Sequence, residues 1–261
     1  MDELKRFRLD DRVALVAGGS GGIGVRLCGA LAAVGARLAV VGRSEAGLAA
    51  ARKAVEKAGS AALVLQGDMT KEADADRVVD ETVRAFGRLD ILVNAVGGGI
   101  GAALHPAEEY PEPDWDWVMD LNLRSQFLVS KAAARAMIEG GRGGRILNIS
   151  SVRGQLGIRL GYSPYVAAKA AMNGLTRQHA TEWAKYGVTV NAVSPTFVRT
   201  PQVESLLADE SFRRGLVERI PLGRIAEPDD LVGTVLFFCS DASSFVTGQV
   251  LTVDGGLTAC Q

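Results

Sequence analysis

The sequence predicts an α/β domain in which about seven parallel strands form a doubly wound sheet flanked by helices. Short apolar runs alternate with longer helical patterns along the whole chain, which is typical of a parallel sheet with helices on both faces. The chain has 261 residues, 48% hydrophobic and 23% charged, so it can bury a substantial core. Because no proline-rich or low-complexity linker divides it, we expect residues 1–261 to form a single domain.

The expected strands are short apolar runs that stop at glycine or polar residues. They cover 13–17, 38–41, 62–65, 91–93, 146–149, 188–193 and 249–253. The helices between and after them are expected over 25–34, 45–57, 73–86, 115–139, 165–186, 205–219 and 229–238. The helix over 165–186 follows Pro164, because proline is favoured in the first helical turn.

Two longer stretches interrupt this alternation. Residues 97–113 form a loop after the fourth strand, and residues 195–223 follow the sixth strand and carry a helical insert. In open α/β sheets, ligands bind outside the carboxyl ends of the strands, and both stretches leave from those ends. We therefore expect both to border a binding site, with 195–223 as the substrate loop.

Composition excludes several classes of function. The net charge of -1 and the absence of a basic stripe exclude nucleic acid and anionic membranes as partners. The N-terminus lacks the apolar core of a signal peptide, and no apolar run is long enough to span a membrane. Cys28, Cys239 and Cys260 are widely spaced and suggest reduced thiols in a cytoplasmic protein. His105 and His179 are too few for a histidine-built metal site, so no metal is expected.

A glycine-rich turn lies between the first expected strand and the first expected helix. Gly18, Gly22 and Gly24 allow a tight turn and a close approach of backbone to phosphate. A pyrophosphate would meet the helix amides here, with Ser20 and Ile23 in the same turn. A plain glycine turn is the alternative, but its position after the first strand favours a dinucleotide.

The ends of the second and third strands indicate which dinucleotide binds. An acidic residue at the end of the second strand favours NAD, whereas an arginine accommodates the 2′-phosphate of NADP. This chain has Gly42, Arg43 and Ser44 there, so NADP is favoured over NAD, unless Arg43 is only a solvated loop residue. Asp68, followed by Met69, ends the third strand and could contact adenine or cap a helix.

Four polar residues are candidates for catalysis. Tyr165 and Lys169 are one helical turn apart, so an ammonium beside the phenol would lower its pKa from about 10 and make it a general acid or base. The pair could also be a chance arrangement on a helix face. At the end of the fifth strand, the hydroxyl of Ser150 or Ser151 could bind a substrate oxygen. Asn122 lies in a helical stretch that disfavours asparagine, which suggests a polar role such as holding a water.

Together these motifs resemble those of the short-chain dehydrogenase/reductase family, from about residue 12 to residue 256. The glycine turn resembles the family's TGxxxGIG, Asp68 its adenine-contacting aspartate, and Asn94 the start of its NNAG segment. Residues 195–200 resemble PGxxxT, and 246–249 and 253–256 resemble the C-terminal signature. In order and approximate spacing, the catalytic tetrad is matched by Asn122, Ser151, Tyr165 and Lys169.

The resemblance implies a Rossmann-type fold, a homotetramer, and hydride transfer between a nicotinamide and a carbonyl or secondary alcohol carbon. Tyr165 would be the general acid/base, Ser151 would polarise the substrate oxygen, and Asn122 would anchor a water. Lys169 would lower the Tyr165 pKa and hold the nicotinamide ribose. The residues expected to bind the cofactor are Gly18, Ser20, Gly22, Ile23, Gly24, Arg43, Ser44, Asp68, Met69, Asn94, Ala95, Gly97, Tyr165, Lys169, Pro195, Thr196, Val198 and Thr200.

The chain departs from the family pattern at four positions. Ala17 replaces a threonine and Ala95 replaces the second asparagine, and because these two normally make one contact, we expect altered loop packing rather than lost binding. Thr196 replaces a glycine beside the nicotinamide, and Gly21 stands where many NADP-preferring relatives carry a basic residue.

The substrate stays open at the level of sequence. The expected lining is 97–104, 152–157, Tyr162 and 197–207, in which Arg153, Gln155, His105 and Tyr162 could orient a polar group. The expected substrate contacts are Ser151, Tyr162, Tyr165 and Gln155. Sugars and polyols, 3-oxoacyl thioesters, steroids and small ketones all fit, with the 3-oxoacyl and sugar-type members nearest. A non-catalytic nucleotide-binding regulator or scaffold of the same fold is the alternative.

Overall fold

Seven parallel strands form one sheet in the computed structural model, which describes residues 3–98, 104–159 and 161–260. The strand order is β3-β2-β1-β4-β5-β6-β7. The strands are β1 (Val13–Ala17), β2 (Arg37–Gly42), β3 (Ala62–Gln66), β4 (Ile91–Asn94), β5 (Gly144–Ile149), β6 (Val188–Pro195) and β7 (Val250–Val253). The doubly wound, Rossmann-like fold predicted from the sequence is therefore confirmed. The strand order reverses between β1 and β4, which is where such sheets bind ligands.

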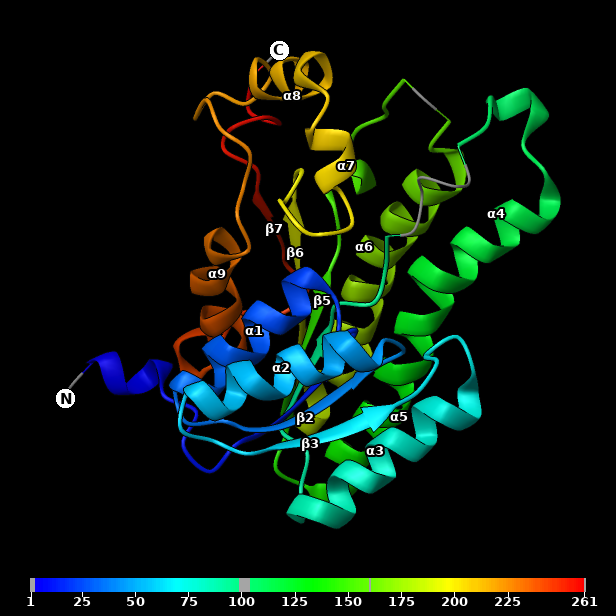
Figure 1. The fold of residues 1–261 in the computed structure, drawn as a ribbon. Coiled ribbons are helices and arrows are strands. Elements are labelled where there is room, and N and C mark those ends of the chain that lie inside the picture. The colour runs from blue at the N-terminus through cyan, green and yellow to red at the C-terminus, as the bar shows by residue number, and fades with distance from the viewer. Residues whose placement is uncertain (1–2, 99–103, 160, 261) are drawn as a thin grey trace.

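Helices cover both faces of this sheet (Figure 1). They are α1 (Gly22–Ala33), α2 (Glu45–Lys57), α3 (Glu72–Phe86), α4 (Glu112–Met119), α5 (Ser125–Gly140), α6 (Ser163–Trp183), α7 (Glu204–Leu207), α8 (Glu210–Val217) and α9 (Asp229–Cys239). Apolar side chains of α1, α2 and α9 share one core cluster, those of α3, α5 and α6 share a second, and a small third cluster lies in the α7–α8 insert.

The apolar run of β1 shows why the strands are nearly all hydrophobic. Ala14 and Val16 belong to the core on the α1 side, while Val13 and Leu15 belong to the core on the α3 side. Because a central parallel strand is buried on both faces, successive side chains must all be apolar. The same reasoning explains why each strand could be predicted from a short apolar run in the sequence.

Two expected helices differ from the structure. The stretch 115–139 is helical, but Asp120–Arg124 forms a π-helical turn between α4 and α5. The prediction of a single helix over 205–219 is wrong, because the helix is interrupted between α7 and α8. The Asp209 carboxylate there accepts the amides of Ser211 at 2.8 Å and Phe212 at 3.1 Å and starts a new helix.

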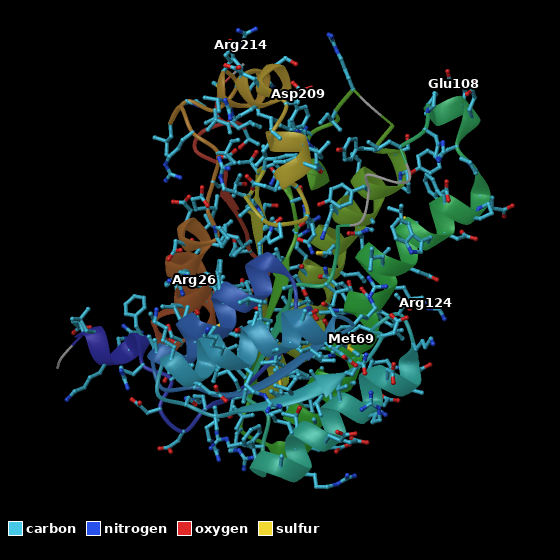
Figure 2. All side chains as sticks on the ribbon, viewed as in Figure 1. Arg26, Met69, Glu108, Arg124, Asp209 and Arg214 are labelled. Carbon is cyan, nitrogen blue, oxygen red and sulfur yellow. The ribbon has the colours of Figure 1, made fainter. Side chains whose placement is uncertain are left out.

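The insert formed by α7 and α8 lies beyond the carboxyl ends of β6 and β7 (Figure 1). Figure 2 labels Asp209 and Arg214 on this insert and Glu108 on the segment before α4. Among the residues described, no helix combines the length and apolarity needed to cross a bilayer.

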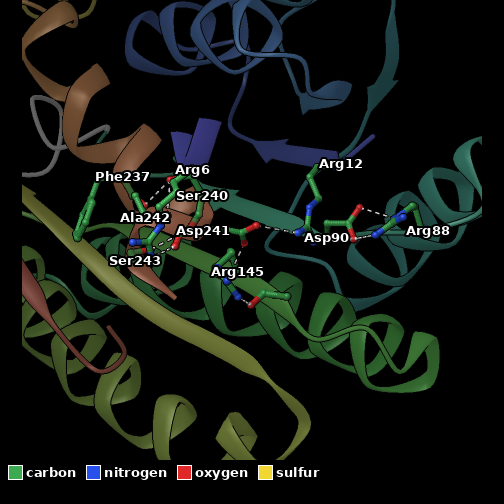
Figure 3. A network of polar contacts seen from close by, with 11 residues as sticks. Arg6, Arg12, Arg88, Asp90, Arg145, Phe237, Ser240, Asp241, Ala242 and Ser243 are labelled. Carbon is green, nitrogen blue, oxygen red and sulfur yellow. Dashed lines mark hydrogen bonds and ion pairs between the residues drawn. The ribbon is translucent and has the colours of Figure 1, made fainter. Parts of the chain in front are cut away.

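A polar network joins the opposite, amino ends of the central strands (Figure 3). Asp90 is buried, accepts the Val13 amide at 2.8 Å and forms an ion pair with Arg88 at 2.6 Å. Asp241, which follows α9, pairs with Arg145 of β5 at 3.3 Å. These contacts tie β1, β4 and β5 together at the end of the sheet away from the glycine-rich turn.

Candidate active site

The glycine turn after β1 is tightly packed against two other loops. Gly18 has a φ of +78°, and a Cβ there would lie 2.6 Å from the backbone of Ala95. A Cβ on Gly22 would lie 2.8 Å from the Thr200 side chain. No side chain caps α1, and its first turn holds no acidic residue. The turn thus has the close backbone approach and uncapped helix start that fit a dinucleotide pyrophosphate.

Backbone contacts hold this turn where two family side chains are missing. The Ala95 amide donates to the Ala17 carbonyl at 2.8 Å, so the two loop starts are joined directly. This bond continues the β1–β4 ladder, and the expected change in loop packing stays a prediction. The Asn94 side chain instead donates to Ser130 at 2.8 Å and Asn148 at 2.9 Å inside the core, which leaves its backbone as the part that can face a cofactor.

The ends of β2 and β3 carry the residues predicted to contact the adenosine half. Arg43 is exposed and makes no ion pair within the described chain, while the Ser44 hydroxyl accepts the Gly47 amide at 3.2 Å and caps α2. Asp68 accepts the amide of Thr70 at 3.1 Å, which stabilises the turn before α3. Met69 is buried in the core.

Tyr165 and Lys169 meet the end of β5 from the first turns of α6. The Lys169 ammonium is 5.6 Å from the centre of the Tyr165 ring and donates to the Ile149 carbonyl at 3.0 Å. Lys169 is only 3% exposed, and burial lowers its pKa from 10.5 to about 7. A buried lysine without a carboxylate partner loses its charge readily near neutral pH.

The pKa of Tyr165 shifts in the opposite direction from the one expected. Burial raises it above 10, and a hydrogen bond with the Ser151 side chain opposes this rise. The prediction that Lys169 lowers the pKa of Tyr165 is therefore wrong in this structure. The physical reason is that Lys169 is itself desolvated and directs its ammonium at Ile149, not at the phenol oxygen.

Only one of the two candidate serines lies at Tyr165. Ser150 donates to the Asn173 side chain at 2.7 Å, whereas Ser151 is the residue that interacts with the phenol. The Ser194 hydroxyl of β6 donates to the Ser151 carbonyl at 2.9 Å and fixes the position of that residue. Ser194 is not among the residues predicted from the sequence, although a serine within an apolar strand indicates a buried hydroxyl that needs a hydrogen-bond partner.

Asn122 is held in the π-helical turn between α4 and α5. Its side-chain oxygen accepts the Gly98 amide at 2.9 Å, and its nitrogen donates to the Val118 carbonyl at 3.0 Å. A Cβ on Gly97 would lie 2.9 Å from the Asn122 oxygen and 3.3 Å from the Lys169 nitrogen. Gly97 therefore brings Asn122 and Lys169 together, and π-helical turns are frequent at functional sites.

The loop after β6 closes the other side of the site. The Thr196 amide donates to Val253 at 3.4 Å, and Val198 forms an isolated bridge with Ala226. Thr200 then packs on Gly22, so the expected cofactor segment 195–200 reaches the glycine turn.

The expected substrate residues differ in their contacts with Tyr165. The Tyr162 ring packs edge-on to Tyr165 with 6.2 Å between centres, and it borders a cavity of about 450 Å³. Gln155 is exposed and donates to Thr252 of β7 at 3.2 Å. His105 forms a 2.6 Å contact with Asp114, and residues 99–103 of the expected lining 97–104 lie outside the described residues.

Known proteins share both the sequence and this architecture. A family model described as enoyl-(acyl carrier protein) reductase matches residues 17–258. Gluconate 5-dehydrogenase of Gluconobacter oxydans is 42% identical over 97% of this chain and 96% of its own length. A short-chain type dehydrogenase/reductase from Mycobacterium marinum superposes with a TM-score of 0.92 at 34% identity, covering 98% and 99% of the two chains.

The crystal structure of a third relative contains bound ligands. The gluconate 5-dehydrogenase from Burkholderia cenocepacia, in complex with NADP and tartrate, has a TM-score of 0.92 and 37% identity and covers 99% and 100% of the two chains. These relatives are named as dehydrogenases or reductases, which gives the non-catalytic alternative no support. The chain is an NAD(P)-dependent oxidoreductase and belongs to the short-chain dehydrogenase/reductase family.

Proposed function

We propose that the chain uses NADP(H) to interconvert a carbonyl group and a secondary alcohol, with Asn122, Ser151, Tyr165 and Lys169 as its catalytic residues. One observation carries the proposal: Ser151, Tyr165 and Lys169 converge at the carboxyl end of β5. The segment 95–97 connects this group to the glycine turn, because Ala95 packs on Gly18 and Gly97 packs beside Lys169.

The roles follow from the geometry of these side chains. The nicotinamide supplies or accepts the hydride when the dinucleotide is bound. Ser151 donates a hydrogen bond to the substrate oxygen, and Tyr165 gives that oxygen a proton in reduction or removes one in oxidation. Lys169, with a pKa of about 7, exists in both protonation states near neutrality and so can pass a proton on. Asn122 holds the backbone amide of Gly98 in place.

The preference for NADP over NAD rests on Arg43. It stands at the end of β2 without an ion-pair partner among the described residues, and the first carboxylate after the strand is Glu45, which begins α2. The NADP complex of the Burkholderia cenocepacia relative supports the same choice.

The proposed function is tested by titrating the protein with NADPH and NADH and by following NADPH oxidation with a panel of ketones and keto sugars. Arg43→Gln should weaken the binding of NADPH by about 10-fold and leave the binding of NADH unchanged, because only the contact with the 2′-phosphate is lost. Arg52→Gln, a change at an exposed arginine of α2, is the control. Equal affinity for both dinucleotides, unaffected by Arg43→Gln, contradicts the NADP assignment, and no ketone turnover contradicts the reaction.

We further propose that residues 1–261 act as one domain in a cytoplasmic homotetramer. Exposed apolar side chains on β7 and α5, at Leu251 and Phe127, support an interface. Cys28 and Cys239 are buried free thiols, as suits a reducing compartment. Sedimentation at micromolar concentration should give four times the chain mass, and a monomer would contradict the assembly.

A further inference from the structure

Arg153 is a buried cation next to the reacting groups. It lies two residues after Ser151, in the 3₁₀ turn Val152–Gly154, and is 8% exposed. One of its terminal nitrogens donates to the Gly157 carbonyl at 3.0 Å. Burial raises the pKa of Tyr162 and of Tyr165, and the positive charge of Arg153 opposes this rise in both tyrosines.

No described carboxylate neutralises this arginine. The other well-shielded arginines of the fold have one: Arg88 pairs with Asp90 at 2.6 Å and Arg145 with Asp241 at 3.3 Å. For Arg153, the single contact with Gly157 is the only hydrogen bond its side chain makes within the described chain. An unpaired buried charge is expensive, so a fold that keeps one usually supplies its counter-charge from elsewhere.

A second arginine approaches from the substrate loop. Gln155 donates to Thr252 of β7, which places the Arg153 turn beside that strand. Beyond the strand, the Leu222 amide donates to the Gly255 carbonyl at 3.1 Å, so the segment that carries Arg219 packs on the strand end. Burial, and then the positive charge of Arg219, lower the pKa of Arg153.

The nearest carboxylate of this strand end is already engaged. Asp254 accepts the amide of Gly256 at 2.9 Å and that of Thr258 at 2.7 Å, which folds the turn after β7. It forms no ion pair with Arg153 or Arg219 within 4.0 Å in the described chain. Arg153 therefore lies near the two tyrosines with Arg219 as a second cation nearby, and no described carboxylate forms an ion pair with either arginine.

We propose that Arg153, assisted by Arg219, binds a carboxylate of the substrate, so that the enzyme acts on a hydroxy acid or oxo acid. The inference rests on the proposed function, since it assigns the substrate class of the same site. The bond to Gly157 fixes one edge of the guanidinium, and the remaining nitrogens match the two oxygens of a carboxylate.

The test compares acids with neutral alcohols of the same carbon skeleton. The purified chain is assayed with NADP⁺ on gluconate and glucitol and on galactonate and galactitol, with glucose 6-phosphate as a phosphate-bearing probe. In at least one pair, kcat/KM should favour the acid by about 100-fold or more. Arg153→Gln should remove that preference, mainly through KM, and Arg153→Lys should restore part of it.

Two further variants refine the comparison. Arg219→Gln should lower the preference for the acid by a smaller factor, because Arg219 is exposed and its charge is screened by water. Arg84→Gln removes a cation from the last turn of α3, at the far end of the sheet, and should leave the preference unchanged. NADPH affinity measured by fluorescence shows whether each variant keeps its folded cofactor site.

The outcomes separate this inference from the function on which it rests. Equal or better use of the neutral member in both pairs overturns the inference but leaves the reaction class intact. The same holds if Arg153→Gln lowers kcat/KM equally for the acid and the neutral alcohol of a pair. That result would give Arg153 the structural role of holding Gly157 in place. Preference for the phosphate that depends on Arg153 overturns the carboxylate as its ligand. If the wild-type chain binds NADPH but turns over no alcohol or ketone, both proposals fail together.

Discussion

At the scale of single residues, burial away from water determines the direction of the pKa shifts in the site. Burial lowers the pKa of Lys169 from 10.5 to about 7 and raises that of Tyr165 above 10, so two pKa values that are nearly equal in water move apart. The phenol of Tyr165 therefore holds its proton more tightly than the ammonium of Lys169 does. This separation comes from the burial of both groups where α6 meets β5 rather than from an ion pair.

Lys169 should therefore make stability depend on pH. Its pKa is 10.5 when unfolded and about 7 when folded, so between these values the unfolded chain binds more protons and stability rises with pH. Below pH 7 both states are protonated and the full penalty of burying the charge applies. Urea unfolding of Lys169→Met and wild type should show the advantage of the variant shrinking by roughly 2 kcal/mol from pH 6.5 to 9. A difference that is constant with pH contradicts the shift.

At the scale of elements, close packing of the glycine turn on the loop after β6 positions the cofactor cradle. Gly22→Ala places a Cβ 2.8 Å from the Thr200 side chain and 2.9 Å from Pro201, so residues 200–201 must move. NADPH affinity should fall by about 10-fold or more, because a shift of a few tenths of an ångström misplaces several contacts at once. Gly233→Ala in α9, where a Cβ meets nothing within 4 Å, is the control. Unchanged NADPH affinity in Gly22→Ala shows that the cradle does not depend on this contact.

The sequence predicted elements better than it predicted contacts. Each buried strand was visible as an apolar run because its two faces are both covered. The break at Asp209 and the π-helical turn at Asn122 were not predicted, since both depend on local hydrogen bonds that interrupt an otherwise helical pattern. Periodicity alone also left Ser150 and Ser151 equivalent. Which of them faces Tyr165 depends on the turn at the strand end, and the burial of Arg153 depends on packing from distant segments.

At the scale of the whole molecule, the two ends of the sheet carry different tasks. The carboxyl ends hold the candidate active site, while the amino ends hold the Asp90 and Asp241 network. Asp90→Ala removes a buried partner of Arg88 and of the Val13 amide, so we expect a loss of roughly 3 kcal/mol in unfolding free energy. Urea denaturation measures this loss, and NADPH titration of the folded variant should give the wild-type affinity. A large loss of affinity would show that the two ends are coupled.

Tyr165 is the central residue of the proposed reaction, because it exchanges a proton with the substrate oxygen. The most direct measurement is the turnover number of Tyr165→Phe beside its NADPH affinity, with Tyr186→Phe as control, because Tyr186 lies exposed after α6. We predict that Tyr165→Phe lowers turnover by about 10²–10⁴-fold and leaves NADPH affinity close to wild type, while the control changes neither. Turnover of Tyr165→Phe near that of wild type would contradict the assignment.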